Sequence, residues 1–192
     1  KMIKGAGMVL YDLDPEEFDA PFDKASGGGA IFGATGGVLE AALRTAAHML
    51  DGKSKKVEFK EVRGPAQLRE ATYEIAGVKL KVAVTSGLAN AKALIHQIQS
   101  GEADYQFVEI MACPGGCING GGQPVQSDSV RNYVDLKALR SKALYDSDKA
   151  NRIRRSFETP MIKTVYDEYF DAPGKPRAHK ILHTHYVKRS KY

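Results

Sequence analysis

Apolar residues recur at helical spacing between residues 36 and 52, within the stretch IFGATGGVLEAALRTAAHMLDG. At 3.6 residues per turn, one face collects Val38, Leu39, Ala42, Leu43, Ala46 and Met49. The opposite stripe is polar and consists of Glu40, Arg44 and His48. The pattern predicts an amphipathic helix whose Glu40 and Arg44, one turn apart, form an ion pair on the outer face.

The ends of this helix are predicted from residues with strong local preferences. Thr35 is a suitable N-cap for a helix that begins at about Gly36, and Gly52 is a suitable end. The preceding segment, Asp14 to Ala30, is rich in Asp, Pro and Gly, so it is predicted to be a loop.

Alternating polar and apolar residues predict strands in the middle of the chain. Lys56–Gly64 alternates in this way, and residues 71–87 predict two strands joined by a turn at Ala76–Gly77. A short amphipathic helix then closes at Gly101, and Tyr105–Cys113 is apolar enough to be a buried strand. We therefore expect a strand–helix–strand unit whose two strands are parallel.

The last third of the chain has a different character, with little aliphatic density of its own. Residues 134–148 and 159–174 each show helical spacing, and Thr159–Pro160 is a plausible helix start. We therefore predict an α/β fold with a mainly parallel sheet flanked by helices, followed by a helical arm. The expected domains are residues 1–133 and residues 134–192.

Composition limits the class of protein without identifying it. The 192 residues are 43% hydrophobic and 27% charged, as in an ordinary soluble domain. We expect no transmembrane helix and no secretory signal, and two cysteines cannot build a disulfide-dense scaffold, which favours a reducing compartment. Because the first residue is Lys1, we expect a piece of a longer protein.

The net charge of +5 comes from the last third, where Lys and Arg outnumber Asp and Glu after Arg131. These basic residues are interleaved with acids and are not massed in one run. We therefore interpret them as a solvated surface, and we expect neither nucleic acid nor a membrane as a partner.

The chemistry is concentrated in EIMACPGGCINGGGQP, residues 109–124, which contains both cysteines. A helical turn beginning at Pro114 would bring the β-carbons of Cys113 and Cys117 within about 5–6 Å. The surrounding glycines leave room for a bulky group beside the backbone. From the residues alone, an iron–sulfur cluster, a zinc half-site, a redox disulfide and two inert thiols all remain open.

Three stretches carry a resemblance to a known family. EIMACPGGCINGGGQP resembles the third cluster-binding signature of the [FeFe]-hydrogenases, and IFGATGGVLEAALRTA and RAHKILHTHY are similar to other stretches of that family. The resemblance implies that Cys113 is a thiolate ligand of a [4Fe–4S] cubane. It also implies that Cys117 ligates the cubane and bridges it to a two-iron subsite with CO, cyanide and dithiolate ligands, the H-cluster.

The same resemblance implies an apolar wall around the two-iron subsite. Met111 would lie against that subsite, and Phe32, Gly33 and Val38 would help to form the pocket around its diatomic ligands. Large Met and Phe side chains exclude water, while Gly33 permits close approach. Cys117 and Met111 are therefore the expected catalytic residues, and Cys113 and Cys117 the expected metal ligands.

The resemblance is incomplete, because two earlier motifs of the family, TSCCPxW and MPCxxKxxE, do not occur here. The expected partners are the amino-terminal lobe, ferredoxin-like domains with accessory Fe–S clusters, and a ferredoxin or a NAD(P)-linked electron-transfer subunit. We expect a cytoplasmic oxidoreductase that converts protons and electrons to H2 reversibly and is inactive as this chain alone. The alternative is a non-catalytic iron–sulfur assembly or sensory homologue.

Other polar residues receive plainer interpretations. His179, His183 and His185 are expected to pack or hydrogen-bond within the tail, and His48 and His96 to be exposed on helices. Glu109 is expected either to be a partner for backbone groups or to support the cluster ligands indirectly.

Overall fold

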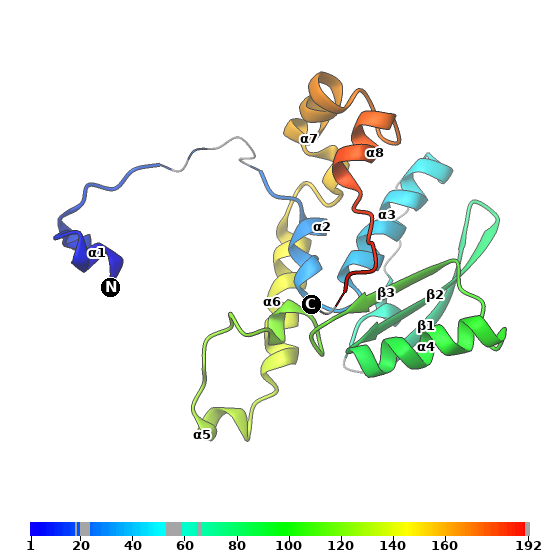
Figure 1. Cartoon of the computed structure of the whole chain (residues 1–192), viewed down its shortest axis with the longest axis horizontal. Helices are drawn as coiled ribbons and strands as arrows, with labels where there is room; N and C mark the ends of the chain where they lie inside the picture. The colour runs from blue at the N-terminus through cyan, green and yellow to red at the C-terminus, as the bar shows by residue number, and fades with distance from the viewer. Residues whose placement is uncertain (18, 20–23, 53–58, 65–66, 191–192) are drawn as a thin grey trace.

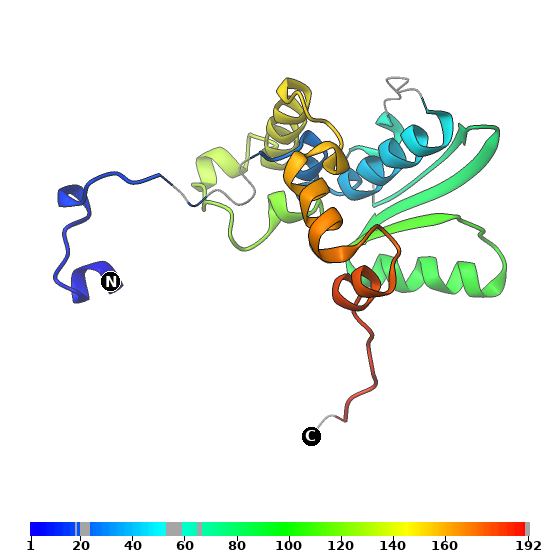
Figure 2. The same ribbon diagram turned by 90° about the horizontal axis from the view of Figure 1, so that it is seen from above.

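The computed structural model describes residues 1–17, 19, 24–52, 59–64 and 67–190. Its centre is a three-stranded sheet with a helix on each face, α3 on one side and α4 on the other (Figures 1 and 2). The elements of this layer are β1 (Leu68–Ile75), β2 (Val78–Ser86), β3 (Phe107–Met111), α3 (Gly37–Asp51) and α4 (Leu88–Ser100). The α/β class predicted from the sequence is confirmed.

The sheet has the order β1-β2-β3 and is mixed. β1 and β2 form the predicted antiparallel hairpin, in which Ala76 (φ 51°) and Gly77 (φ 79°) both have the left-handed backbone that suits a two-residue turn. β2 and β3 are parallel, with Val84 opposite Glu109, and the helix between them, α4, ends at Gly101. The predicted strand–helix–strand unit is therefore confirmed. The expectation of a mainly parallel sheet is wrong for the described strands, since the hairpin supplies one of their two pairings.

The main core lies between α3 and the sheet. Its buried members are Leu39, Leu43, Ala47, Phe59, Val62, Ile75, Val82 and Val84. Leu39 and Leu43 thus confirm the predicted apolar face, but Met49 is 75% exposed and Glu40 is fully buried. The buried face is therefore rotated toward Glu40, because that carboxylate finds cationic partners inside the protein.

A cluster of five charged residues occupies that position, and we call it the ion-pair cluster: Glu40, Arg44, Arg63, Asp148 and Arg154. Glu40 accepts from Arg44 and Arg63 at 2.6 Å each, and Arg44 also donates to Asp148 at 2.8 Å. The predicted pair between Glu40 and Arg44 exists, but it is buried rather than on an outer face. Asp148 comes from α6, so the cluster joins two distant parts of the chain.

The strand predicted at Lys56–Gly64 is only partly described, since residues 53–58 lie outside the described residues. Within the described part, Lys60–Val62 forms a 3₁₀ turn (η3), so the prediction is wrong there. The reason is that Phe59 and Val62, three residues apart, are both buried in the core, a spacing that a 3₁₀ turn satisfies and a strand does not.

The last third is helical, as predicted. Asp135 caps α6 by accepting from the N–H of Ala138 at 2.9 Å, and α7 starts at Pro160 after Thr159. The segments are α5 (Asp128–Arg131), α6 (Leu136–Ala150), α7 (Pro160–Val165), a π-helical turn (Tyr166–Phe170) and α8 (Pro176–Leu182). Because α6 packs on α2 (Gly27–Ala30) and shares the ion-pair cluster, it is part of the body, and the domain boundary at 133/134 stays a prediction.

The predicted loop from Asp14 to Ala30 is described only in part, because residues 18 and 20–23 lie outside the described residues. The short helix α2 occupies its end, and Ser26 caps it through the N–H of Gly29 at 3.0 Å. A helix therefore replaces the end of the loop, since Gly27 and Gly28 allow it to approach Asp148 and Arg154 closely.

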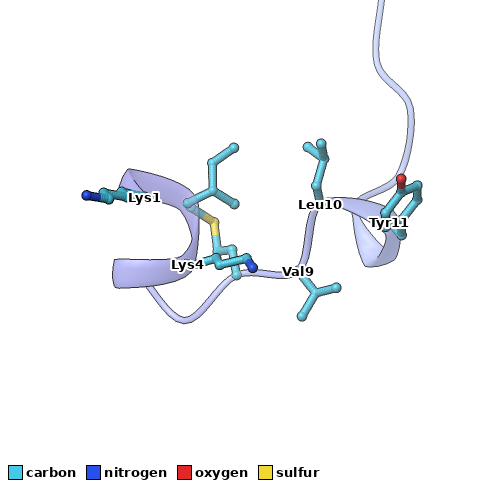
Figure 3. Close-up of a pocket in the computed structure, with 7 residues that line it drawn as sticks. Lys1, Lys4, Val9, Leu10 and Tyr11 are labelled. Carbon is cyan, nitrogen blue, oxygen red and sulfur yellow. The ribbon is translucent and has the colours of Figure 1, made fainter.

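The chain begins with an arm that reaches away from this body (Figures 1 and 2). The arm contains α1 (Met2–Gly5) and a 3₁₀ turn (Leu10–Asp12). Their exposed apolar side chains form a small concave surface, shown in Figure 3. Among the described residues, no helix has the length and apolar character needed to cross a membrane.

Candidate metal centre

The two cysteines lie on a loop at the carboxyl end of β3. The N–H of Gly87, at the end of β2, donates to the carbonyl of Met111 at 2.8 Å and aligns the strand end from which the loop leaves. Cys113 and Cys117 are both exposed and both are free thiols. Of the interpretations left open by the sequence, a disulfide between them is not what this structure contains.

The backbone between the cysteines is not the helical turn predicted from Pro114. Gly115 (φ 89°) and Gly116 (φ 93°) both adopt a left-handed backbone, and the N–H of Gly116 closes a turn onto the carbonyl of Cys113 at 2.9 Å. A right-handed turn would require negative φ at both glycines, so the prediction is wrong. A 3₁₀ turn begins only at Cys117 (η4, Cys117–Asn119).

The loop is seated against the segment that precedes α3. The N–H of Thr35 donates to the carbonyl of Gly115 at 3.1 Å. A β-carbon placed on Gly116 would lie 2.6 Å from the carbonyl oxygen of Gly33 and 2.8 Å from the nitrogen of Thr35. Glycine is therefore required at 116 by both backbone conformation and space, and Gly33 is in contact with the cysteine loop.

The other expected pocket residues differ in their exposure. Met111 ends β3 and is half-buried, while Val38 is half-buried in the first turn of α3. Phe32 belongs to a 3₁₀ turn (η2, Ile31–Gly33) and is 44% exposed. Gly33 is also crowded by α6, since an added β-carbon would lie 2.7 Å from Cδ1 of Leu144.

Two cationic side chains of α6 reach the loop, and the sequence analysis missed both. Arg140 donates from Nη1 to the carbonyl of Ile118 at 2.9 Å and from Nη2 to the carbonyl of Pro124 at 3.1 Å. The stem of Lys137 lies over Gly115, with Cδ 3.3 Å from the position of an added β-carbon. The signal in the sequence is the three-residue spacing of these two residues on one helix.

Glu109 organises the start of α3 from the neighbouring strand. It is buried, and its two oxygens accept from the N–H of Gly36 at 2.5 Å and the N–H of Leu39 at 2.7 Å. The prediction that it partners backbone groups is confirmed. The prediction that Thr35 caps the helix is wrong, since its Oγ1 has no hydrogen-bond partner in the described part of the chain.

A buried guanidinium group lies beside this carboxylate. Arg69 donates from Nη2 to the carbonyl of Thr35 at 3.0 Å. Burial lowers the pKa of the Arg69 guanidinium, and the nearby charge of Glu109 partly opposes that effect. Arg69 thus supports the segment before α3.

The histidines do not complete a metal site. The rings of His179 and His183 lie 4.4 Å apart on the exposed tail, and His96 is exposed as predicted. His48 was expected to be exposed, but it is half-buried because its ring packs 5.1 Å from Phe157. In the described ranges no three His, Cys, Asp or Glu residues are grouped to hold a metal ion. The two thiols are therefore at most half of a four-ligand site.

Comparison with known proteins shows the family to which the chain belongs. The family described as "Iron only hydrogenase large subunit, C-terminal domain" matches residues 1–121. The chain belongs to this iron hydrogenase family. The family "Iron hydrogenase small subunit" matches residues 134–189, which correspond to most of the predicted helical arm.

Several relatives of this iron hydrogenase chain are hydrogenases. It is 40% identical over 192 residues to the NADP-reducing hydrogenase subunit HndD of Solidesulfovibrio fructosivorans, covering all of this chain and 32% of that protein. It is 42% identical over 189 residues to iron hydrogenase 1 of Clostridium pasteurianum, covering 98% of this chain and 33% of that protein. The chain thus spans about a third of the length of these relatives.

Other relatives carry a different description. Protein NAR1 of Arabidopsis thaliana is 32% identical over 193 residues, covering 96% of this chain and 40% of that protein.

Among solved structures, the [FeFe]-hydrogenase HydA1 of Chlamydomonas reinhardtii matches with a TM-score of 0.66 and 38% identity, over 97% of this chain and 53% of that chain. The small sheet with flanking helices is therefore the architecture of a known hydrogenase region.

Proposed function

We propose that this chain is part of an [FeFe]-hydrogenase that interconverts H2 with two protons and two electrons, and that it acts only together with an amino-terminal lobe outside this sequence. The observation that carries the proposal is the pair of free, exposed thiols, Cys113 and Cys117, on a glycine loop at the carboxyl end of β3. The 40% and 42% identity to two hydrogenases supports the same reaction.

The residues present fit a share of an iron–sulfur group. Thiolates are soft ligands that suit iron–sulfur clusters. Arg140 holds the loop that bears them through the carbonyl of Ile118, and the stem of Lys137 lies over Gly115. Cys113 and Cys117 would hold the [4Fe–4S] cubane, with Cys117 also bridging to the two-iron subsite of the H-cluster. When bound, that group supplies the redox-active iron that joins protons and electrons.

The remaining pocket residues have steric roles in this proposal. Gly116 keeps the cysteine loop in close contact with the segment before α3, because a side chain there would collide with the backbone of Gly33 and Thr35. Gly33 in turn makes room for Leu144 of α6. Met111, Phe32 and Val38 would limit the access of water and oxygen to the iron. Phe32 is 44% exposed here, so it is available to be covered by the lobe that completes the site.

Exposed apolar surface supports the need for that lobe. The arm before Asp12 exposes Met2, Val9, Leu10 and Tyr11, each by more than half, although such side chains are normally covered in a stable assembly. The proposed partners are the rest of the hydrogenase, with its accessory Fe–S clusters, and a ferredoxin or a NAD(P)-linked subunit as the electron partner. The similarity to an NADP-reducing hydrogenase subunit supports the second kind of electron partner.

A cytoplasmic location is part of the proposal. The region similar to the small subunit is fused to the cysteine-bearing lobe in one chain. The large subunit of the periplasmic hydrogenase of Nitratidesulfovibrio vulgaris, in contrast, matches only 78% of this chain, at 45% identity. A fused arrangement does not require the two parts to be exported and assembled separately.

A second candidate is a role in iron–sulfur assembly without turnover. It is favoured by the similarity to protein NAR1 and to the cytosolic iron-sulfur assembly component 3 of Bos taurus, which is 31% identical over 196 residues. Both relatives cover nearly all of this chain, including the two-cysteine loop. Their lower identity makes hydrogenase activity the better-supported function.

The two candidates are separated by an assay of the complete protein. We expect the protein that contains this chain and its amino-terminal lobe, once matured, to evolve H2 from a reduced electron donor and to show infrared stretches of iron-bound CO and CN. A protein that binds iron and shows only the spectrum of a plain [4Fe–4S] cluster, with no H2, would contradict the hydrogenase proposal and support the assembly role.

A further inference from the structure

Glu109 connects the strand that leads to the cysteines with the segment that carries the pocket wall. Its two hydrogen bonds reach across 73 and 70 residues of sequence to the N–H groups of Gly36 and Leu39. Both bonds are buried, and a carboxylate near the positive end of a helix is stabilised by the helix dipole. The glutamate therefore acts as a clamp between β3 and α3.

The segment held by this clamp is compact. The N–H of Gly37 donates to the carbonyl of Ala34 at 2.9 Å, and an added β-carbon at Gly37 would lie 1.7 Å from the carbonyl oxygen of Ile31. Val38 lies between Gly36 and Leu39, the two residues whose N–H groups donate to Glu109. A movement of the first turn of α3 would therefore move the segment from Ile31 to Leu39 as one piece.

The cysteine loop contacts the same segment from another direction. The carbonyl of Gly115 accepts from the N–H of Thr35 at 3.1 Å, and Gly116 fits only because it has no side chain against Gly33. Cys113 follows Glu109 by four residues on the same strand and loop. Glu109 thus fixes the position of the first turn of α3 relative to β3, the strand that leads to the two cysteines.

We propose that Glu109 is a positioning residue, whose carboxylate fixes the spacing between the pocket wall, residues 32–38, and the cysteine loop, residues 113–117. The inference rests on the proposed function, because the spacing matters only if an iron group is held between wall and loop. Glu109 does not touch that group in this account; it acts through the N–H groups of Gly36 and Leu39 and through the contact of Thr35 with Gly115.

A matched pair of substitutions isolates this role. Glu109→Gln keeps the size of the side chain but replaces one acceptor oxygen with an NH2 donor, which faces an N–H donor and breaks one of the two bonds. Glu40→Gln is the control, since Glu40 is also buried and lies in the first turn of α3, yet its partners are the guanidinium groups of Arg44 and Arg63. Glu109→Asp keeps the charge but shortens the reach, and it serves if Glu109→Gln does not fold.

The first readout is amide hydrogen exchange in the complete protein without metal, followed by mass spectrometry of peptides from residues 31–43. We expect Glu109→Gln to speed exchange at Gly36 or Leu39 by about ten-fold or more, because a charge-assisted bond is lost. Exchange at the N–H of Thr35 should also become faster, since its hydrogen bond to Gly115 depends on the spacing between residues 32–38 and the cysteine loop. At matched global stability, Glu40→Gln should leave Thr35 protected. Unchanged exchange at Gly36 and Leu39, or protection at Thr35 that survives their exposure, would overturn the proposal.

The second readout is the infrared spectrum of the iron-loaded complete protein. We expect Glu109→Gln to shift the bands of iron-bound CO and CN, while Glu40→Gln leaves them at the wild-type positions. Equal spectra for both variants and the wild type would contradict a positioning role. Because hydrogen exchange is measured without metal, its result is the same whether or not the wild type carries an H-cluster, so a failure of the proposed function is distinguished from a failure of the clamp.

Discussion

Two buried glutamates near the start of α3 have different kinds of hydrogen-bond partner. One is bound by arginine side chains and the other by backbone N–H groups. Glu40 is balanced by guanidinium groups of Arg44 and Arg63, inside a cluster that ties α3 to α6. Glu109 is instead bound by the backbone N–H groups of Gly36 and Leu39, at the start of α3. Side-chain ion pairs thus join distant segments of the fold, while a capping carboxylate holds the start of α3, next to Thr35, whose N–H contacts the cysteine loop.

The largest expected effect comes from removing a ligand at the site while the ion-pair cluster stays intact. Cys117→Ser in the complete protein should abolish the two-iron subsite and reduce H2 turnover by more than about a hundred-fold, because even indirect supports of metal ligands are worth about 10–100-fold. Cys117 is exposed, so the stability of the metal-free protein should change by less than about 0.5 kcal/mol. Infrared bands and normal turnover in this variant would show that Cys117 is not a ligand.

The complementary change breaks the ion-pair cluster and leaves the cysteines in place. Arg44→Met removes a shared partner of Glu40 and Asp148 and should cost about 3–5 kcal/mol, the usual effect of leaving buried charges unpaired. Urea unfolding measures the loss. Lys142→Met is the control, since its ion pair with Asp146 is exposed and should contribute less than about 0.5 kcal/mol. Equal losses for the two variants would rule out a structural role for the cluster.

A smaller effect is expected where the loop meets the segment before α3. Gly116→Ala requires a left-handed backbone and places a β-carbon 2.6 Å from the carbonyl oxygen of Gly33, so it should cost about 1–3 kcal/mol and weaken iron retention. Gly121→Ala is the matched control, because nothing lies within 4 Å of its added β-carbon. Thermal unfolding and iron analysis of both variants make the test, and an alanine tolerated equally at 116 and 121 would contradict the described contact.

Acid should weaken the ion-pair cluster through Asp148. Burial alone would raise the pKa of Asp148, but hydrogen bonds from Arg44 and Arg154 outweigh it and hold that pKa below its ordinary value. Its contribution to stability is thus complete above the unfolded pKa and is lost as the pH falls through the lower folded value. The stability difference between wild type and Asp148→Asn, from urea unfolding at pH 6 to 3, should shrink below about pH 4. A constant difference would exclude this linkage.

The smallest expected effect is at the pocket wall. Met111→Leu conserves volume, so it should cost less than about 1.5 kcal/mol and keep bound iron, while it shifts the infrared bands of the iron-bound CO and CN. Met49→Leu is the control, since Met49 is 75% exposed at the far end of α3. Complete loss of iron in Met111→Leu would mean that this residue does more than line the pocket.

Local signals account for the parts of the fold that were predicted correctly. The hairpin at Ala76–Gly77 and the helix ends at Gly52 and Gly101 each depend on residues adjacent in sequence. The parallel pairing of β2 and β3 follows from the short helix between them. Such features are readable because the residues that form them interact with near neighbours.

The errors arise where a partner lies far away in the sequence. Glu40 was placed on an outer face because Arg63 is 23 residues away and contributes only after folding. Local sequence predicts Thr35 as the cap because the true capping group, on Glu109, is 70 or more residues distant. Gly115 and Gly116 have positive φ angles because the loop packs closely against Gly33 and Thr35. The spacing of apolar residues along the sequence does not reveal such a long-range contact.

The central claim is that Cys113 and Cys117 together hold iron whose other ligands lie outside this chain. The most direct test is the iron content per molecule of the complete matured protein, wild type against Cys113→Ser, with Gly121→Ala carried through the same purification. We expect Cys113→Ser to lose the whole cluster assigned to this site and Gly121→Ala to retain it. Wild-type iron content in Cys113→Ser would contradict the claim.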